Sequence, residues 1–339
     1  MPQSADPRRE ALERWLRTQL RDAPFTLAVA SEDASFRRYF RVVLGDGRSY
    51  VVMDAPPERE PCGPFVHVAG LLRAAGVNAP EIHAQDLAQG FLLLTDLGTQ
   101  TYLDVFRTAG AERARTLMAD ATEALVRWQR ASRPGVLPAY DAERLRTEMA
   151  LFPQWYLGRH LGLALQPEQT AELERIFALL IASATAQPQV FVHRDYMPRN
   201  LMLSEPNPGV LDFQDAVIGP ISYDIVSLLR DAFISWDEEQ VLDWCVRYWE
   251  RARAAGLPLD ADFAEFFRAF EWMGLQRHLK VLGIFARLTH RDGKPKYVAD
   301  TPRFVHYART VAQRYAPLAA LARLLQQVDG QAPRSVLSF

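Results

Sequence analysis

The sequence predicts an α+β fold of two lobes, a small β-rich N-lobe over residues 1–97 and a larger, mostly helical C-lobe over residues 98–339. Two observations predict this division. Short runs of β-branched and aromatic residues dominate the first part of the chain, whereas long amphipathic patterns dominate the rest. A chain of 339 residues is also long enough to bury two separate hydrophobic cores.

The N-lobe is expected to open with a helix and to continue as strands. The apolar residues of that helix share one face: Leu12, Trp15, Leu16 and Leu20. The runs FTLAVA, SFRRYFRVVL and SYVVMDA, within residues 25–55, are typical of strands, and GDG at 45–47 indicates a hairpin turn. The run PFVHVAGLLRAAG predicts a helix that ends at Gly76, and EIHAQD and FLLLTDL predict a second hairpin.

The C-lobe is expected to be helical from Thr101 onward. Amphipathic patterns cover residues 111–132, 141–161, 167–186, 237–255, 261–290 and 301–327. The segments predicted to be extended are short, and they flank a polar loop: 190–192, 201–203 and 209–213. A connector at residues 95–98 (TDLG) joins the two lobes.

Composition and charge exclude several classes of protein. The 39 basic and 41 acidic residues leave a net charge of −2, so no basic field indicates a nucleic acid or membrane partner. The two cysteines, Cys62 and Cys245, argue against a disulfide scaffold or a zinc site. The charged N-terminal residues do not resemble a signal peptide, and the longest uncharged stretch, 176–192, contains a proline. We therefore expect a cytoplasmic protein of undetermined oligomeric state.

Two acidic residues and one amide mark the candidate site. The strand at 190–192 is followed by Asp195, Asn200 comes five positions later, and a second strand leads to Asp212. Phosphoryl transfer needs a carboxylate that accepts the proton of the acceptor hydroxyl, and oxygen ligands that hold Mg²⁺ against nucleotide phosphates. The pattern predicts Asp195 as the base and Asn200 and Asp212 as metal ligands, with ATP and Mg²⁺ as cofactors.

Three further polar residues near this loop have other expected roles. His193 is expected to hold Asp195 by hydrogen bonding within the loop. Asp224 precedes a run of apolar helical residues, where a carboxylate suits the helix dipole, and is expected to support the loop from a buried position. Two roles stay open for Asp215: contact with the substrate, or support of the reacting groups.

The spaced motif resembles the aminoglycoside phosphotransferase/choline kinase family, a relative of the protein kinases. The resemblance is carried by HRDYMPRN (193–200), LDFQD (211–215) and GPISYD (219–224), and it covers the chain from about residue 25 to at least 290. It implies a bilobal protein-kinase-like fold and an ATP-dependent kinase activity.

A closer resemblance within that family adds an acceptor. The opening helix and the run YVVMDAPPERE resemble bacterial anomeric kinases that act on N-acetylmuramate and N-acetylglucosamine. This resemblance implies phosphorylation of the anomeric (C1) hydroxyl of an amino sugar, giving a sugar 1-phosphate for cell-wall recycling. The alternatives are a family member with an aminoglycoside, choline or hydroxy-amino-acid acceptor, and a non-catalytic nucleotide-binding protein.

The nucleotide side departs from the family pattern. Kinases of this type cover the phosphates with a glycine-containing turn and pair them with a lysine on the third strand. Here the turn at 30–35 reads ASEDAS, and Met53 stands where the lysine is expected. The expected substitutes are backbone amides and hydroxyls of two serines and the guanidinium of one of two arginines: Ser31, Ser35, Arg37 and Arg38. The alternative is a lobe that does not bind ATP productively.

The resemblance also implies where adenine and acceptor bind. Backbone groups of the connector residues Thr95, Asp96 and Leu97 would meet the adenine edge, with Val51 and Leu211 as apolar walls above and below the ring. The acceptor pocket of related kinases is lined by the helix that corresponds to residues 141–161. Its polar residues Glu148 and Arg146 are therefore candidate substrate contacts, together with Asp215; the alternative for the two helical residues is an ordinary solvated face.

Overall fold

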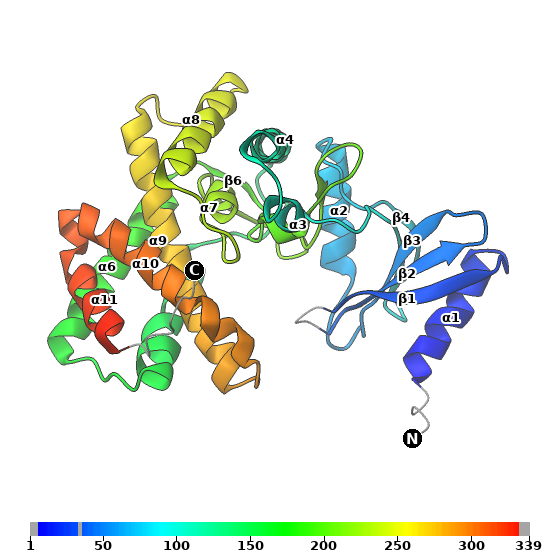
Figure 1. Ribbon diagram of the computed structural model, residues 1–339, viewed down its shortest axis with the longest axis horizontal. Coiled ribbons are helices and arrows are strands. Elements are labelled where there is room, and N and C mark those ends of the chain that lie inside the picture. Colours follow the sequence, from blue (N-terminus) through cyan, green and yellow to red (C-terminus); the bar gives the residue numbers. More distant parts are fainter. Residues whose placement is uncertain (1–5, 33–35, 332–339) are drawn as a thin grey trace. The chain divides into compact units, whose positions relative to one another are not determined.

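The computed structural model of the chain describes residues 6–32 and 36–331 (Figure 1). These residues divide into two units. Unit 1 takes in the described residues up to Ala124 together with Arg199–Asp215, and unit 2 takes in Leu125–Pro198 and the described residues from Ala216 onward. The predicted N-lobe of residues 1–97 falls in unit 1, which extends further along the chain and also receives the segment that carries Asn200 and Asp212.

Unit 1 is built on a five-stranded antiparallel sheet in the order β1-β2-β3-β5-β4. The strands are β1 (Phe25–Glu32), β2 (Arg38–Leu44), β3 (Ser49–Asp54), β4 (Ile82–Asp86) and β5 (Phe91–Thr95). The predicted hairpin between β2 and β3 is present, and Gly47 adopts a φ of +86° in its turn, a conformation that glycine reaches without steric cost. The predicted mixed fold with a β-rich first part is confirmed.

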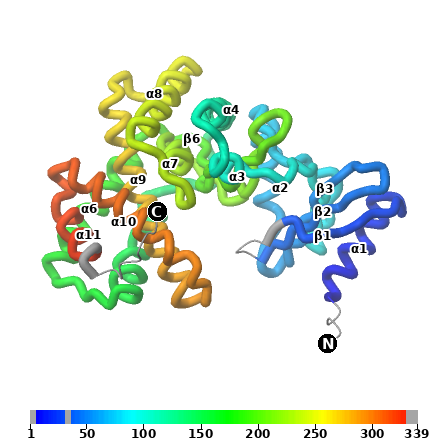
Figure 2. Tube along the Cα trace, in the orientation of Figure 1, coloured from blue at the N-terminus to red at the C-terminus, as the bar shows by residue number. Residues whose placement is uncertain are grey.

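The sheet has two different faces because side chains alternate along each strand. On one face, Phe40 and Val42 of β2 pack against Trp15 and Leu16 of α1 (Pro7–Gln19), which lies against the sheet in Figures 1 and 2. The neighbouring side chains of the same strand, Tyr39 and Arg41, point to the opposite face. The face covered by α1 is therefore the hydrophobic core of the sheet, and the other face is left for a cavity.

The remainder of unit 1 consists of helices that follow the strands and of a short hairpin from residues 201–210. Helix α2 (Gly63–Ala74) connects β3 to β4, and α3 (Tyr102–Phe106) and the start of α4 (Ala111–Arg130) follow β5. The 3₁₀ turn η2 (Pro198–Asn200) leads into the hairpin of β7 (Leu201–Met202) and β8 (Gly209–Val210). Backbone hydrogen bonds from Val210 N to Asn78 O (2.7 Å) and from Leu203 N to Gln100 O (2.9 Å) fasten this hairpin to unit 1.

Unit 2 is mainly helical, as predicted. Its helices are α5 (Ala142–Met149), the π-helix η1 (Phe152–His160), α6 (Pro167–Ala186), α7 (Tyr223–Leu229), α8 (Glu238–Ala254), α9 (Phe263–His290), α10 (Thr301–Arg314) and α11 (Ala319–Gln331), with 3₁₀ turns η3 (Pro295–Asp300) and η4 (Ala316–Leu318). Strands β6 (Gln189–Val192) and β9 (Val217–Pro220) pair antiparallel. Among the described helices, none is long and apolar enough to cross a membrane.

Two predicted helices are interrupted in the structure. The pattern at 141–161 forms α5 and then η1, and the pattern at 301–327 forms α10 and then α11. Pro153 and Pro317 lie at these breaks, and proline has no N–H to continue the ladder of helical hydrogen bonds. The amphipathic pattern therefore continues across each break, while the backbone changes direction or helix type.

The core of unit 2 surrounds α9, whose middle is buried on nearly all sides. Leu151, the residue before η1, lies close to α9 at Gly283. A Cβ atom built at Gly283 would lie 2.4 Å from the backbone carbon of Leu151 and 2.5 Å from its Cβ. Glycine at this position therefore allows the two backbones to meet.

We expect Gly283→Ala to lower the free energy of unfolding by about 1–3 kcal/mol, because the added methyl group overlaps backbone atoms that cannot move independently. Gly274→Ala, in the same helix, is the matched control. Its Cβ would lie 3.5 Å from Val226, an ordinary contact, so replacing a helical glycine by alanine is neutral or stabilises by up to about 1 kcal/mol. Urea unfolding followed by circular dichroism measures both; equal stability of the two variants would contradict the close approach.

Candidate functional site

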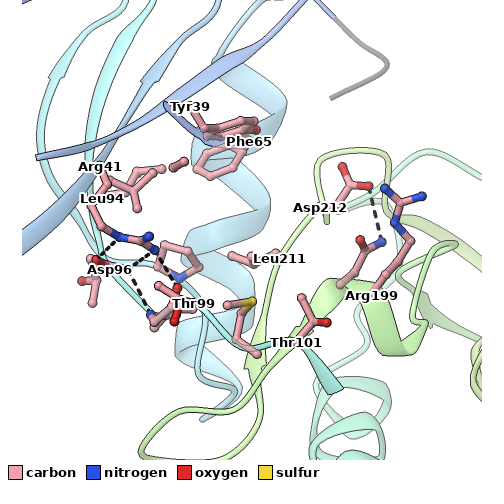
Figure 3. A pocket seen from close by; sticks show the side chains of 18 residues that line it. Tyr39, Arg41, Phe65, Leu94, Asp96, Thr99, Thr101, Arg199, Leu211 and Asp212 are labelled. Atoms are coloured by element: carbon pink, nitrogen blue, oxygen red, sulfur yellow. Dashed lines mark hydrogen bonds and ion pairs between the residues drawn. The ribbon is translucent and has the colours of Figure 1, made fainter. Parts of the chain in front are cut away.

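A cavity of about 350 Å³ lies in unit 1, on the face of the sheet opposite α1 (Figure 3). Strands β2, β3 and β5, the connector after β5 and the β7–β8 segment contribute its walls. The lining residues are Ala30, Tyr39, Arg41, Val51, Phe65, Pro80, Leu94, Thr95, Asp96, Leu97, Gly98, Thr99, Thr101, Arg199, Asn200, Met202, Leu211 and Asp212. Apolar side chains from both walls and polar groups at its ends suit a flat, partly polar ligand.

The connector residues predicted to meet adenine all line this cavity. Asp96 holds the connector in shape by accepting hydrogen bonds from Arg41 Nε (2.7 Å) and Nη2 (3.0 Å) and from the N–H of Gly98 (3.0 Å). Burial disfavours the charged carboxylate of Asp96, but the bonds from Arg41 and Gly98 outweigh it, so its pKa lies below the usual value. The expected apolar walls, Val51 and Leu211, line the cavity as well.

The two predicted metal ligands meet at one end of the cavity. Asn200 Nδ2 lies 3.4 Å from Asp212 Oδ2, and the backbone N–H of Leu211 donates to Asn200 O at 2.9 Å. Asp212 has a φ of +61°, a left-handed conformation that aspartate tolerates better than most residues, and it accepts a bond from Gln214 at 2.8 Å. The side chains of the two ligands are thus held side by side at the end of a short hairpin.

The donor set of this pair fits Mg²⁺. Magnesium takes hard oxygen ligands, and in nucleotide sites one or two protein side chains suffice because phosphates and waters complete the octahedron. Across residues 6–32 and 36–331, no group of three or more His, Cys, Asp or Glu side chains is arranged to hold a metal ion. One carboxylate and one amide suit a metal that arrives with a nucleotide better than a structural metal.

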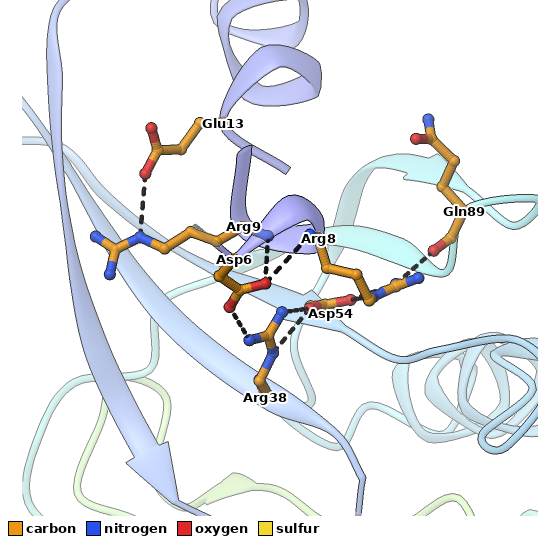
Figure 4. A network of polar contacts seen from close by, with 7 residues as sticks. All are labelled: Asp6, Arg8, Arg9, Glu13, Arg38, Asp54 and Gln89. Atoms are coloured by element: carbon orange, nitrogen blue, oxygen red, sulfur yellow. Dashed lines mark hydrogen bonds and ion pairs between the residues drawn. The ribbon is translucent and has the colours of Figure 1, made fainter. Parts of the chain in front are cut away.

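Two of the predicted phosphate-binding residues, Arg37 and Arg38, lie elsewhere in unit 1, and Figure 4 shows the contacts of Arg38. Arg38 donates from Nε to Asp54 Oδ2 at 2.9 Å and also pairs with Asp6, while Arg8 Nε donates to Asp54 Oδ1 at 2.9 Å. Arg37 forms an ion pair with Glu60 at 2.8 Å. Neither Arg37 nor Arg38 is among the described residues that line the cavity.

Strand alternation explains the position of Arg38, because it shares the α1-facing side of β2 with Phe40 and Val42. Ser31 lies in β1, but its side chain is outside the described part of the structure, as is the whole of Ser35. The roles of these two serines in phosphate binding therefore stay predictions.

In unit 2, the loop after β6 is anchored by a buried carboxylate. Asp224 accepts the backbone N–H of His193 at 2.7 Å and that of Arg194 at 3.0 Å, and it is fully buried. Burial raises the pKa of Asp224 to about 7, and the two backbone bonds offset only part of that effect. His193 Nδ1 accepts the N–H of Asp195 at 3.3 Å. These contacts are the ones that the expected supporting roles of His193 and Asp224 require.

Glu148 belongs to a network of charges next to this loop. Its carboxylate pairs with Arg194 Nη2 at 2.6 Å and with Lys280 Nζ at 3.1 Å, and Tyr140 OH donates to it. Burial raises the pKa of Glu148, but the two cations more than offset it and the pKa lies below the usual value. Arg277 also donates to Arg194 O at 3.4 Å. Arg194, whose φ is +77°, is therefore held through its N–H, its carbonyl and its side chain.

The other two candidate substrate residues are placed differently. Arg146 lies on the exposed side of α5, where it pairs with Glu174. Asp215 is exposed at the end of the unit 1 segment. The structure thus brings Glu148 together with Arg194, the residue before Asp195, and does not bring Arg146 to that network.

Sequence reasoning missed the cations that line the cavity of unit 1 and those that surround Glu148 and Arg194 in unit 2. Lys280 and Arg277 lie within the buried part of α9. Charged residues on an otherwise apolar helix are rarely buried unless paired, and this pattern could have indicated their role. Arg41 was part of an ordinary strand pattern, and only the structure shows its bonds to Asp96 and the carbonyl of Gly98. No local pattern singled out Arg199, which lines the cavity next to Asn200.

Comparisons with known proteins agree with the resemblance. A model of the phosphotransferase enzyme family matches residues 26–257. Among curated proteins, the N-acetylmuramate/N-acetylglucosamine kinase of Pseudomonas aeruginosa is 59% identical over 302 residues, covering 89% of this chain and 88% of the relative. The proteins of the same name from Pseudomonas putida (53% over 337 residues; 96% and 98%) and Neisseria meningitidis (51% over 320 residues; 94% and 95%) are also similar.

Solved structures share the fold at low sequence identity. Choline kinase LicA from Streptococcus pneumoniae superposes with a TM-score of 0.60 at 10% identity, covering 90% of this chain and all (100%) of that one. The GDP complex of wild-type aminoglycoside 2'-phosphotransferase-IIIa superposes with a TM-score of 0.60 at 15% identity, covering 90% and 99%. At these identities the likeness concerns the fold alone.

Proposed function

Because the chain belongs to the phosphotransferase enzyme family, we propose that it is an ATP-dependent kinase whose acceptor is an N-acetylated amino sugar, N-acetylmuramate or N-acetylglucosamine. The observation that carries the acceptor is the identity of 59% to the Pseudomonas aeruginosa kinase over almost the full length of both chains. The observation that supports the chemistry is the pair Asn200 and Asp212 at the end of a nucleotide-sized cavity. We propose the cytoplasm as its location.

In the proposed reaction, the anomeric (C1) hydroxyl oxygen attacks the γ-phosphorus of ATP. A bond forms from O1 to phosphorus, the bond from phosphorus to the β,γ-bridging oxygen breaks, and ADP leaves with that electron pair. The proton of the hydroxyl passes to Asp195. Since the ring oxygen stabilises the oxyanion, an anomeric hydroxyl is more acidic than an ordinary alcohol, and a weak base suffices. The product is a sugar 1-phosphate, a form suited to the reuse of cell-wall sugars.

Different residues bind the nucleotide, hold the metal ion and position Asp195. Thr95, Asp96 and Leu97 present backbone groups to the adenine edge, and Asn200 and Asp212 supply oxygens for Mg²⁺. When bound, this ion neutralises charge on the phosphate oxygens of the nucleotide. His193 and Asp224 fix the backbone of the loop that carries Asp195. The carboxylate of Asp195 is therefore oriented before the substrate binds, which lowers the entropy cost of reaching the transition state.

The acceptor is tested by measuring ADP release from ATP and Mg²⁺ with a panel of hydroxyl compounds. We expect turnover with N-acetylmuramate and N-acetylglucosamine, and background release with choline, kanamycin and homoserine. The aminoglycoside and choline kinases share only the fold with this chain, so they do not support those acceptors. Turnover of any of the three control compounds in place of the N-acetyl sugars would overturn the proposed acceptor class.

A further inference from the structure

Nucleotide phosphates are bound by positively charged groups, and the structure limits which side chains of unit 1 can serve as those groups. The lysines of the sequence are Lys280, Lys294 and Lys296, all in unit 2. On β3, Met53 is fully buried between Tyr39 and Leu92 on the neighbouring strands. The permanently charged cationic side chains of unit 1 are therefore its arginines.

Several described arginines of unit 1 that do not line the cavity pair with carboxylates. Arg8 and Arg38 share Asp54, and the remaining pairs are Arg37 with Glu60, Arg48 with Asp46, and Arg73 with Glu81. Among the described residues that line the cavity, the cationic ones are Arg41 and Arg199. Arg41 donates to Asp96 and to the carbonyl of Gly98, so it lies at the connector end of the cavity. Arg199 lies next to Asn200, one of the proposed metal ligands.

We propose that Arg199 binds the β- and γ-phosphates of the nucleotide and takes over the electrostatic task of the missing lysine. Arg199 is the central residue of η2, adjacent to Asn200, and its side chain is exposed. Figure 3 shows it at the same end of the cavity as Asp212, away from Arg41 and Asp96. A cation at this end meets the phosphates that the proposed metal ligands also face.

The chemistry of arginine suits this position. A guanidinium is always charged and presents a planar fork of N–H donors that binds two phosphate oxygens at once. The backbone bond from Leu211 N to Asn200 O ties η2, which carries Arg199 and Asn200, to the segment of Asp212. The lysine of related kinases approaches from the third strand, whereas Arg199 approaches from the turn that carries the metal ligand.

This inference rests on the nucleotide use included in the proposed function, and direct binding tests it. We would titrate ATP, ADP, AMP and adenosine into the wild-type protein and into Arg199→Ala, Arg199→Lys, Arg37→Ala and Arg48→Ala, by calorimetry with Mg²⁺ present. For Arg199→Ala we expect about 10- to 100-fold weaker binding of ATP and ADP and unchanged binding of adenosine, because bonds to charged groups contribute about 1.5–3 kcal/mol each. Arg199→Lys should recover part of the affinity. Arg48→Ala, in an exposed pair far along β2–β3, should bind like wild type.

Three outcomes would overturn the inference: unchanged ATP and ADP affinity in Arg199→Ala, equal weakening of adenosine and ATP, or loss of ATP affinity in Arg37→Ala alone. In steady-state assays the KM for ATP should rise while the KM for the acceptor stays the same, since a role in acceptor binding would move the second constant. The binding experiment contains no acceptor. A wrong acceptor class therefore leaves it intact, and its failure leaves the acceptor class untouched.

Discussion

Asp195→Asn is expected to lower kcat about 10²- to 10⁴-fold, the range that positioned general bases contribute, while ATP affinity changes less than about twofold. Asparagine has nearly the same shape as aspartate and can still accept a hydrogen bond, but it cannot take a proton from the acceptor hydroxyl. The loss should therefore affect kcat and kcat/KM alike, since the interaction is made in the transition state. Initial-rate kinetics with saturating ATP, together with ATP titration by calorimetry, measure both quantities.

The control for this variant is Asp243→Asn on α8, where the carboxylate is exposed and pairs with Arg247 at 2.7 Å one helical turn away. Solvent screens such a surface pair and it contributes little, so activity and stability should stay near wild type. An Asp195→Asn enzyme that retained more than about a tenth of the wild-type kcat would remove Asp195 from the reaction. It would also favour a protein whose role is nucleotide binding without catalysis.

Glu148→Ala is expected to lower the free energy of unfolding by about 3–5 kcal/mol, because it leaves Arg194 and Lys280 without their shared carboxylate in a largely buried site. The Glu148 side chain is 18% exposed and those of Arg194 and Lys280 are 19% and 11% exposed, so water replaces little of the lost interaction. Activity should fall in addition, since Arg194 precedes Asp195 and its left-handed backbone depends on the same contacts.

Two further variants distinguish the effect of leaving buried charges unpaired from the effect of removing a glutamate side chain in general. Glu174→Ala removes the partner of Arg146 in an exposed pair and should cost less than about 1 kcal/mol. Adding Lys280→Met to Glu148→Ala should recover about 1–2 kcal/mol, because one of the two uncompensated charges is then gone. Urea unfolding monitored by tryptophan fluorescence gives the free energies of unfolding of the wild type and the three variants. Equal losses for Glu148→Ala and Glu174→Ala would show that burial of the network contributes nothing to stability.

Periodicity was sufficient to predict the two-part fold and most of its elements, because helices and strands follow from local patterns of apolar residues. It did not predict the breaks at Pro153 and Pro317, since the apolar pattern continues past each proline while the backbone hydrogen bonding does not. The position of Arg38 was within reach of the sequence. Phe40 and Val42 mark the core face of β2, and Arg38 alternates with them onto the same face. Strand alternation therefore argued against the predicted contact of Arg38 with phosphate.

The candidate site was predictable where its residues are close in sequence, and unpredictable where helices far apart in the chain bring charges together. Asn200 and Asp212 flank one short hairpin, so their spacing alone indicated that they meet. Glu148, Arg194 and Lys280 come from α5, the loop after β6 and α9. No local pattern links three such segments, and only tertiary packing shows that one carboxylate serves two cations.

The position of the transferred phosphate tests the proposed function most directly. N-acetylmuramate would be incubated with ATP, Mg²⁺ and the wild-type protein, and the product analysed by ³¹P–¹H correlation NMR and by a reducing-end assay. We expect phosphorus coupled to the anomeric proton and loss of the reducing end in step with ADP formation. A phosphorylated product that keeps its reducing end, or ADP formation without any sugar phosphate, would contradict transfer to the C1 hydroxyl.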